Sequence, residues 1–223
     1  MKKYAIIGIC GIAFSQTTFA SEPIDFIHPF IEGGIGMTVN TQDNDVAEKY
    51  GIPYSTFSAN NPNFTYGVNV GSRFLDDSYI YRPGVQFFYN RVTGSGNVNV
   101  ATGYGSIDFD IDASHNLMGG EFDNYVRVSH NEKSDLSDLF GGRWDGFVVL
   151  GLDAGKIKSK YTISVSGTDY NIKDDGTFYG AKIEYLAESK KGLGFTIGMK
   201  LLKTNTEALP TMLITRWGLR YTF

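Results

Sequence analysis

The sequence predicts an all-β protein, a transmembrane β-barrel of antiparallel, up-and-down strands, with eight strands as the expectation and ten as the alternative. Three observations predict this fold class. The first 20 residues have the layout of a secretory leader. Bulky apolar residues then alternate with small or polar residues along the rest of the chain, which is the period of a β-strand. Finally, the alternation continues through "WGLRYTF" to Phe223.

The leader has three recognisable parts. Lys2 and Lys3 precede an apolar run from Tyr4 to Phe14, and Thr18-Phe19-Ala20 is a small-x-small cleavage site. We therefore expect residues 1–20 to be a signal peptide and residues 21–223 to form one outer-membrane barrel domain. The single cysteine, Cys10, leaves with the leader, so disulfides and thiol chemistry are excluded from the mature chain. Removing two lysines changes the formal charge from −4 to −6, which argues against nucleic acid as a partner.

Eight segments carry the alternation, each with one bulky face and one small, polar or charged face. The weakest is the fourth, where Asn124 falls on the apolar face. An even number of strands is typical of bacterial outer-membrane barrels. In chain order the segments are Ile27–Met37, Phe64–Arg73, Gly84–Asn90, Met118–Val128, Phe147–Ala154, Phe178–Tyr185, Leu193–Leu202 and Met212–Phe223.

The connections between these segments alternate between short and long, as expected for periplasmic turns and extracellular loops. Leu75–Ser78 and Glu188–Lys191 are short, and the exceptions to the rule are a long link at Ser129–Gly142 and a short one at Thr204–Pro210. A secreted β-sandwich would also alternate, but its polar face would meet water, and a glycine-rich face with isolated charges is more typical of a barrel interior. The long connections are Thr41–Asn61, Thr93–Asn116 and Lys156–Asp175.

The patterns "FIEGGIGM", "DGFVVLGLDAGK", "YGAKIEYLAESKKGLGFTIGMK" and "WGLRYTF" resemble the small outer-membrane β-barrels, a family that includes the OmpA membrane domain, the opacity proteins and the Ail/OmpX/Lom group. The resemblance covers nearly the whole mature chain through patterns, without a diagnostic motif. It implies a monomer without cofactor, handled by periplasmic chaperones and the barrel-assembly machinery and surrounded by outer-membrane lipid and lipopolysaccharide. It also implies that the last strand is the signal read by that machinery, with a plain closing strand as the alternative. The signal residues would be Trp217, Leu219, Tyr221 and Phe223.

Charged residues recur on the small, polar faces and are expected inside the barrel. Eight strands enclose an interior just wide enough for side chains to fill. Because buried charges must be paired, we expect a packed plug of salt bridges, with a narrow ion path as the alternative. On the weakest segment, Glu121 and Arg127 also fall on this face. The other interior charges expected are Glu32, Arg73, Arg82, Asp153, Lys182, Glu184, Lys200, Arg216 and Arg220.

No catalytic or metal-binding pattern emerges from the sequence. Barrel enzymes need a histidine within reach of a serine or carboxylate, and none of His28, His115 and His130 forms a His-x-Ser pair on a lipid-facing strand. The alternating aspartates of Asp108–Asp112 lack the glycine and glutamate spacing of an EF-hand, because Ala113 and Gly119 stand at those positions. We expect solvated aspartates, with loose divalent-cation binding as the alternative, and a protein that is not an enzyme.

Two stretches continue to alternate beyond the length that a membrane strand needs. They are Val98–Asp112 and Lys158–Lys173, and Ser166–Asp169 is a plausible hairpin tip. Projecting strands have edges that can pair with a partner's strand, which suggests a structural surface protein that adheres to a host or matrix ligand. Mutual packing of the loops and a narrow porin-like channel are the alternatives. In the ten-strand alternative, 97–112 and 161–166 would enter the membrane, although the second is too short.

Overall fold

The computed structural model describes residues 27–41, 63–74, 80–102, 105–131, 144–165, 167–206 and 211–223. The expected signal peptide and the connections expected at Thr41–Asn61, Leu75–Ser78, Ser129–Gly142 and Thr204–Pro210 lie wholly or largely outside these residues. Within the described residues, no helix has the length and apolar character needed to cross a membrane.

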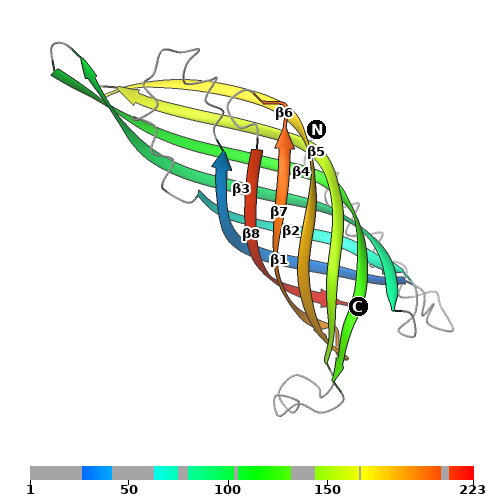
Figure 1. Ribbon diagram of the computed structural model, residues 1–223. Coiled ribbons are helices and arrows are strands. Elements are labelled where there is room, and N and C mark those ends of the chain that lie inside the picture. Colours follow the sequence, from blue (N-terminus) through cyan, green and yellow to red (C-terminus); the bar gives the residue numbers. More distant parts are fainter. Residues whose placement is uncertain are drawn as a thin grey trace.

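Eight antiparallel strands form a closed ring in sequence order (Figure 1). Each strand pairs with its neighbours in the chain, and β1 closes the ring against β8 through a register that runs from Phe30–Thr222 to Thr41–Thr211. The eight-stranded, up-and-down arrangement predicted from the sequence is therefore confirmed. The strands are β1 (Ile27–Thr41), β2 (Asn63–Phe74), β3 (Tyr81–Thr102), β4 (Gly105–Asn131), β5 (Trp144–Val165), β6 (Thr168–Ser189), β7 (Leu193–Thr204) and β8 (Thr211–Thr222).

The ring is apolar outside and charged inside, the reverse of a water-soluble protein. Phe87 and Leu152 point outward with 71% and 67% of their surface exposed, whereas Glu32 and Arg220 point inward and are 0% and 1% exposed. Burial alternates residue by residue along the strands, as the pleat requires. An apolar exterior of this extent is stable only in a lipid environment, so the barrel is of the transmembrane kind.

The outward-facing apolar residues form a band around the ring, which we call the apolar band. At one end, on the four longest strands, its last members are Tyr89, Met118, Ala154 and Tyr179. Beyond that limit the outward faces become polar, beginning with Arg91 on β3. We call this the distal end, and the end that carries the β6–β7 turn the proximal end.

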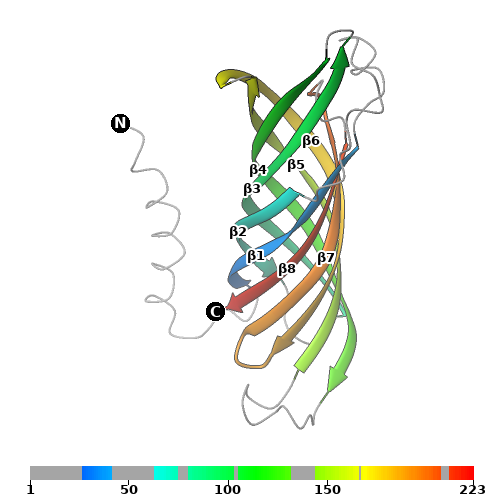
Figure 2. The same ribbon diagram turned by 90° about the vertical axis from the view of Figure 1, so that its left-hand side faces the viewer.

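Four strands, β3 to β6, continue past the distal end of the apolar band (Figure 2). They form what we call the projecting sheet: residues 94–102 of β3, 105–116 of β4, 156–165 of β5 and 168–177 of β6. The long connections expected at 93–116 and 156–175 are thus mainly paired strand, which confirms the projecting strands predicted within them at Val98–Asp112 and Lys158–Lys173. The ten-strand alternative is wrong, because 97–112 and 161–166 lengthen β3–β4 and β5–β6 instead of adding strands.

Two of the close turns between neighbouring strands contain a described glycine with positive φ. The distal β5–β6 hairpin closes between Val165 and Thr168, where Gly167 has φ of +80°, which confirms the hairpin tip predicted at Ser166–Asp169. At the proximal end, the short connection expected at Glu188–Lys191 begins later, because β6 continues to Ser189. Gly192 ends that turn with φ of +83°, a left-handed conformation that glycine adopts without steric cost.

Candidate functional site: the charged interior and the projecting sheet

The interior holds balanced charges. Among the described residues, six buried carboxylates face six buried cationic side chains, so their formal charges cancel. All nine charges expected from the sequence in this position, and Glu121, lie here. Asp123 lies within the fourth predicted segment but was not among the expected interior charges, and Glu188 was assigned to a turn. The carboxylates are Glu32, Glu121, Asp123, Asp153, Glu184 and Glu188, and the cationic residues are Arg73, Arg82, Lys182, Lys200, Arg216 and Arg220.

One ion cluster is centred on Glu32 of β1. Arg220 on β8 donates to Glu32 Oε2 from Nε at 2.9 Å and from Nη2 at 2.6 Å. Arg216 on β8 places Nη2 2.8 Å from Glu32 Oε1, and its Nη1 donates to Asn69 Oδ1 on β2 at 3.0 Å. Glu32 therefore joins β1 to β8 through two arginines at the seam that closes the ring.

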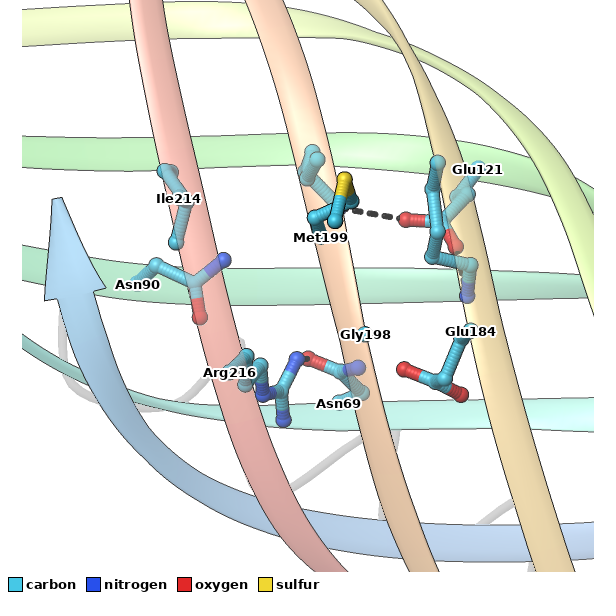
Figure 3. Close-up of a pocket in the computed structure, with 10 residues that line it drawn as sticks. Asn69, Asn90, Glu121, Glu184, Gly198, Met199, Ile214 and Arg216 are labelled. Atoms are coloured by element: carbon cyan, nitrogen blue, oxygen red, sulfur yellow. Dashed lines mark hydrogen bonds and ion pairs between the residues drawn. The ribbon is translucent and has the colours of Figure 1, made fainter. Parts of the chain in front are cut away.

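A second ion cluster is centred on Glu121 of β4. Lys182 contacts Glu121 Oε1, and Lys200 Nζ is 2.6 Å from its Oε2. Lys200 also lies 2.9 Å from Asp153 Oδ2, and Lys182 lies 3.1 Å from Asp123 Oδ1. The two lysines therefore link three carboxylates across β4 to β7. Figure 3 shows Glu121 of this cluster with Arg216, Asn69 and Glu184 around a small cavity, which Lys182 and Lys200 also line.

Apolar side chains lie on both sides of the charged layer. On the distal side they form the distal apolar layer, and on the proximal side the proximal apolar layer. Lys200 Nζ lies 4.0 Å from the ring centre of Phe88, where the distal layer meets the charges. The distal layer comprises Phe88, Val92, Leu117, Ile157, Phe178, Leu202, Met212 and Ile214. The proximal layer comprises Tyr125, Phe147, Val149 and Leu186.

Further charges lie on the proximal side of this second layer. Arg73 Nη1 donates to Glu188 Oε2 at 2.6 Å, which joins β2 to β6 across the interior. The guanidinium of Arg82 lies 4.8 Å from the ring centre of Phe147. Ions would therefore have to pass two apolar layers and two sets of paired charges, and moving a bare ion through apolar surroundings is costly. The arrangement is that of a packed plug.

The histidines lie apart from one another. His115 is 1% exposed, its Nδ1 lies 3.0 Å from Ser159 Oγ, and its ring packs edge-on against Tyr161 at 5.5 Å. This site is distal to the apolar band, and burial lowers the pKa of His115 to about 4. His28 is half-buried at the start of β1, and the His130 side chain lies outside the described residues. Because Ser159 is only 2% exposed, the His115–Ser159 pair is closed to a substrate in this conformation.

The four residues expected as an assembly signal share the outward face of the last strand. Trp217, Leu219 and Tyr221 on β8 and the adjoining Phe223 are each about half exposed. The rings of Tyr221 and Phe223 pack edge-to-face at 5.1 Å. The Phe223 backbone N–H donates to Pro29 O at 2.9 Å, so this residue also links the end of β8 to β1.

The projecting sheet has two edges. β3 pairs with β2 only as far as Thr93, and β6 pairs with β7 from Phe178 onward, so in the described structure 94–102 and 168–176 each have one strand neighbour. Its axis-facing surface includes Ile163 and Val165, which are half-buried, and Tyr170 and Ile172, which are at least half exposed.

The other projecting residues considered from the sequence are only partly described. Ile107 is 42% exposed, whereas the side chains of Val98, Val100, Asp108 and Phe109 lie outside the described residues. Asp110 and Asp112 are exposed, and no cluster suited to a metal ion is found within the described part of the chain.

Fold and interior together define an eight-stranded β-barrel of the transmembrane kind. No protein-family model and no curated protein matches the chain. Solved structures with a similar course of the chain include Ail, the attachment invasion locus protein of Yersinia pestis (16% identity, 88% of this chain and 98% of that chain, TM-score 0.41). They also include Neisserial surface protein A (10% identity, 88% of this chain and 97% of that chain, TM-score 0.38). A third is the outer membrane protease OmpT of Escherichia coli (9% identity, 93% of this chain and 100% of that chain, TM-score 0.44). Similarity at this level adds nothing to the fold that the strand register already defines.

Proposed function

We propose that this chain is a non-conducting outer-membrane β-barrel that presents the projecting sheet of β3–β6 at the surface of a Gram-negative bacterium and adheres through the edges of that sheet. The observation that carries the proposal is the division of the molecule into two parts. The membrane part is filled by paired charges between two apolar layers. The projecting part is a sheet whose two outer strands each have one strand neighbour among the described residues, which is the kind of edge that accepts another strand.

The closed interior is tested by single-channel conductance of the refolded protein, without residues 1–20, in a planar bilayer. Heat-modifiable gel mobility first confirms that the barrel has folded. A silent bilayer is the expected result, because both apolar layers and both sets of paired charges lie across the axis. Steady, reproducible openings from folded protein would contradict the proposal and make the chain a narrow channel.

Adhesion is tested with shortened hairpins. Tyr161 lies opposite Ile172, so replacing 162–171 by Asn-Gly leaves a two-residue hairpin turn between them. Gly96 lies opposite Ile111, so 97–110 can be replaced in the same way. Bacteria that express the doubly shortened barrel should lose binding to host cells or matrix while the barrel still shows heat-modifiable mobility.

The matched control for this experiment alters the other end of the molecule. Lys190 and Lys191 lie in the exposed proximal turn, and replacing both by serine should leave binding unchanged. An epitope inserted at Gly167 should be accessible on intact cells. Equal adhesion by full-length and shortened barrels would rule out the edges as the adhesive surface.

A further inference from the structure

Four lysines line up on the outward face of the projecting sheet. Lys156, Lys158 and Lys160 occupy alternate positions of β5, and Lys173 lies on β6; all four are exposed. Alternate residues of a strand are about 6.6 Å apart, so the three β5 ammonium groups form a row. The row follows Leu150, Leu152 and Ala154 on the same face of the strand, without a gap. The lysines therefore begin where the apolar band ends.

Acidic residues on the same face balance this row only in part, through Asp175 and through Asp112, which lies opposite Thr162, the next outward residue after Lys160. Lys160 lies directly opposite Lys173, and like charges in that position destabilise a pair of strands. Asp175 lies opposite Lys158, and on the other side Asn116 separates Lys158 from Arg91, a further exposed cation. The ion pairs found in the described residues lie inside the barrel, and none includes these four lysines. A surface of this kind gains from an anionic ligand that spans several ammonium groups.

We propose that Lys156, Lys158, Lys160 and Lys173 bind the phosphate groups of a phosphorylated glycolipid in the outer leaflet of the membrane. The position of the row selects a lipid over a soluble anion. The ammonium groups face away from the barrel axis, on the side of the strands that lipid covers, and directly above apolar side chains. A ligand with acyl chains can contact Leu152 and Met118 while its phosphates reach the lysines. The proposal rests on the outer-membrane orientation proposed above, which places the distal end outside.

The test compares two double variants that each remove two exposed lysines. K158Q/K160Q removes the centre of the row, and K190Q/K191Q removes the pair in the proximal turn. Each full barrel, refolded without residues 1–20, is placed in phosphatidylcholine nanodiscs that contain bisphosphorylated lipid A, and bound lipid is counted by native mass spectrometry. Heat-modifiable mobility of each variant confirms folding. We expect K158Q/K160Q to bind lipid A about thirtyfold more weakly than the parent, because each of the two lysines removed contributes a similar factor to the affinity for an anionic lipid surface. K190Q/K191Q should bind like the parent.

Further arms separate the sources of phosphate. Removing the phosphates from lipid A should weaken its binding to the parent at least as much as the K158Q/K160Q change weakens binding of bisphosphorylated lipid A. Added salt should weaken binding of the phosphorylated form. Equal binding of lipid A by the parent and K158Q/K160Q would overturn the proposal. So would complete displacement of lipid A by millimolar inorganic phosphate, or binding of a soluble sulfated polysaccharide through these lysines with lipid A binding unchanged.

Failure of this proposal and failure of the proposed function give different results. The epitope at Gly167 reports on intact cells whether the distal end lies outside. An inaccessible epitope would overturn the surface orientation whatever the nanodisc result, whereas loss of lipid discrimination with an accessible epitope would overturn the lysine site alone.

Discussion

Glu32 of β1 accepts two hydrogen bonds from the guanidinium of Arg220 of β8, at 2.9 and 2.6 Å, across the seam that closes the barrel. Neither side chain is more than 1% exposed. Arg216 also lies 2.8 Å from the second carboxylate oxygen. The two ends of the sheet are therefore joined by buried ion pairs in addition to the backbone register.

Replacing Glu32 by glutamine should destabilise the barrel by roughly 3–5 kcal/mol, because the change keeps the shape of the side chain but removes the carboxylate that Arg216 contacts and leaves Arg220 with only Glu184, at 3.4 Å. The measurement is the urea midpoint of unfolding from lipid vesicles, followed by loss of heat-modifiable mobility. Ile31→Leu, which changes the adjacent lipid-facing residue, should leave the midpoint unchanged. An unchanged midpoint in the Glu32 variant would show that the seam depends on the backbone register alone.

Replacing each of two adjacent glycines of β4 by alanine should have different effects on the free energy of unfolding. A Cβ on Gly119 would meet the carbonyl oxygen of Ala154 and, at 3.1 Å, the Cα of Gly155, which are backbone atoms that cannot rotate away. A Cβ on Gly120 would point outward and meet nothing closer than 3.8 Å. Gly119→Ala should therefore cost roughly 1–3 kcal/mol of unfolding free energy, whereas Gly120→Ala should be neutral or slightly stabilising. Equal midpoints for the two variants would contradict this placement of β4 against β5.

The alternation in the sequence predicts the face of the strand on which a residue lies better than it predicts the position of that residue along the barrel axis or its partner on another strand. It placed Glu32, Arg216 and Arg220 on the inner face because the pleat fixes which side each residue takes. It did not pair them, because partners on β1 and β8 are nearly 190 positions apart and meet only once the register is known. It also took the inner face to be small, polar or charged, so the two apolar layers, to which Phe147 and Met212 belong, were not predicted.

The ends of the strands were the least predictable. The projecting strand predicted at Val98–Asp112 is confirmed, but its alternation did not show that residues 93–116 are the paired ends of β3 and β4. Glu188 was assigned to a short turn, but it pairs with Asp145 of β5 and Gly194 of β7 and therefore belongs to β6. In both places the deciding information is a contact with another strand, which the local sequence does not contain.

Acid should destabilise the barrel through His115, which lies distal to the apolar band. Burial lowers its pKa in the folded protein to about 4 from an ordinary value of 6.5, so the unfolded chain takes up the proton first. The contribution of His115 to the free energy of unfolding is therefore fully present above pH 6.5. It decreases as the pH drops from 6.5 towards 4, by about 3 kcal/mol at most. Urea midpoints between pH 7.5 and 4 measure the effect.

The control for this titration is His115→Gln, which keeps a group that can bond to Ser159 but does not titrate. Its midpoint should fall less than that of the parent over the same pH interval. If the two proteins lose stability in parallel, the acid sensitivity comes from other groups.

The barrel should stay closed to ions even when side chains of the distal apolar layer are shortened. Leu117 and Ile157 lie opposite each other on β4 and β5, and both are fully buried. Changing both to alanine should cost several kcal/mol of stability, at about 2–5 for each. Conductance should stay silent, because the paired charges and the proximal layer still cross the axis. Openings in this variant but not in the parent would show that the distal layer alone closes the barrel.

Phe223 combines two roles that substitutions can separate. Its ring packs on Tyr221 on the outward face, whereas its backbone N–H bonds to Pro29. If the assembly machinery reads the ring, Phe223→Ala and deletion of Phe223 should lower the amount of barrel in the outer membrane to a similar extent while export to the periplasm continues. Phe195→Ala, which removes another half-exposed aromatic ring from β7 at the same end, should assemble normally. Normal assembly of Phe223→Ala together with failure of the deletion would assign the effect to the hydrogen bond with Pro29, and normal levels of both would exclude Phe223 as an assembly signal.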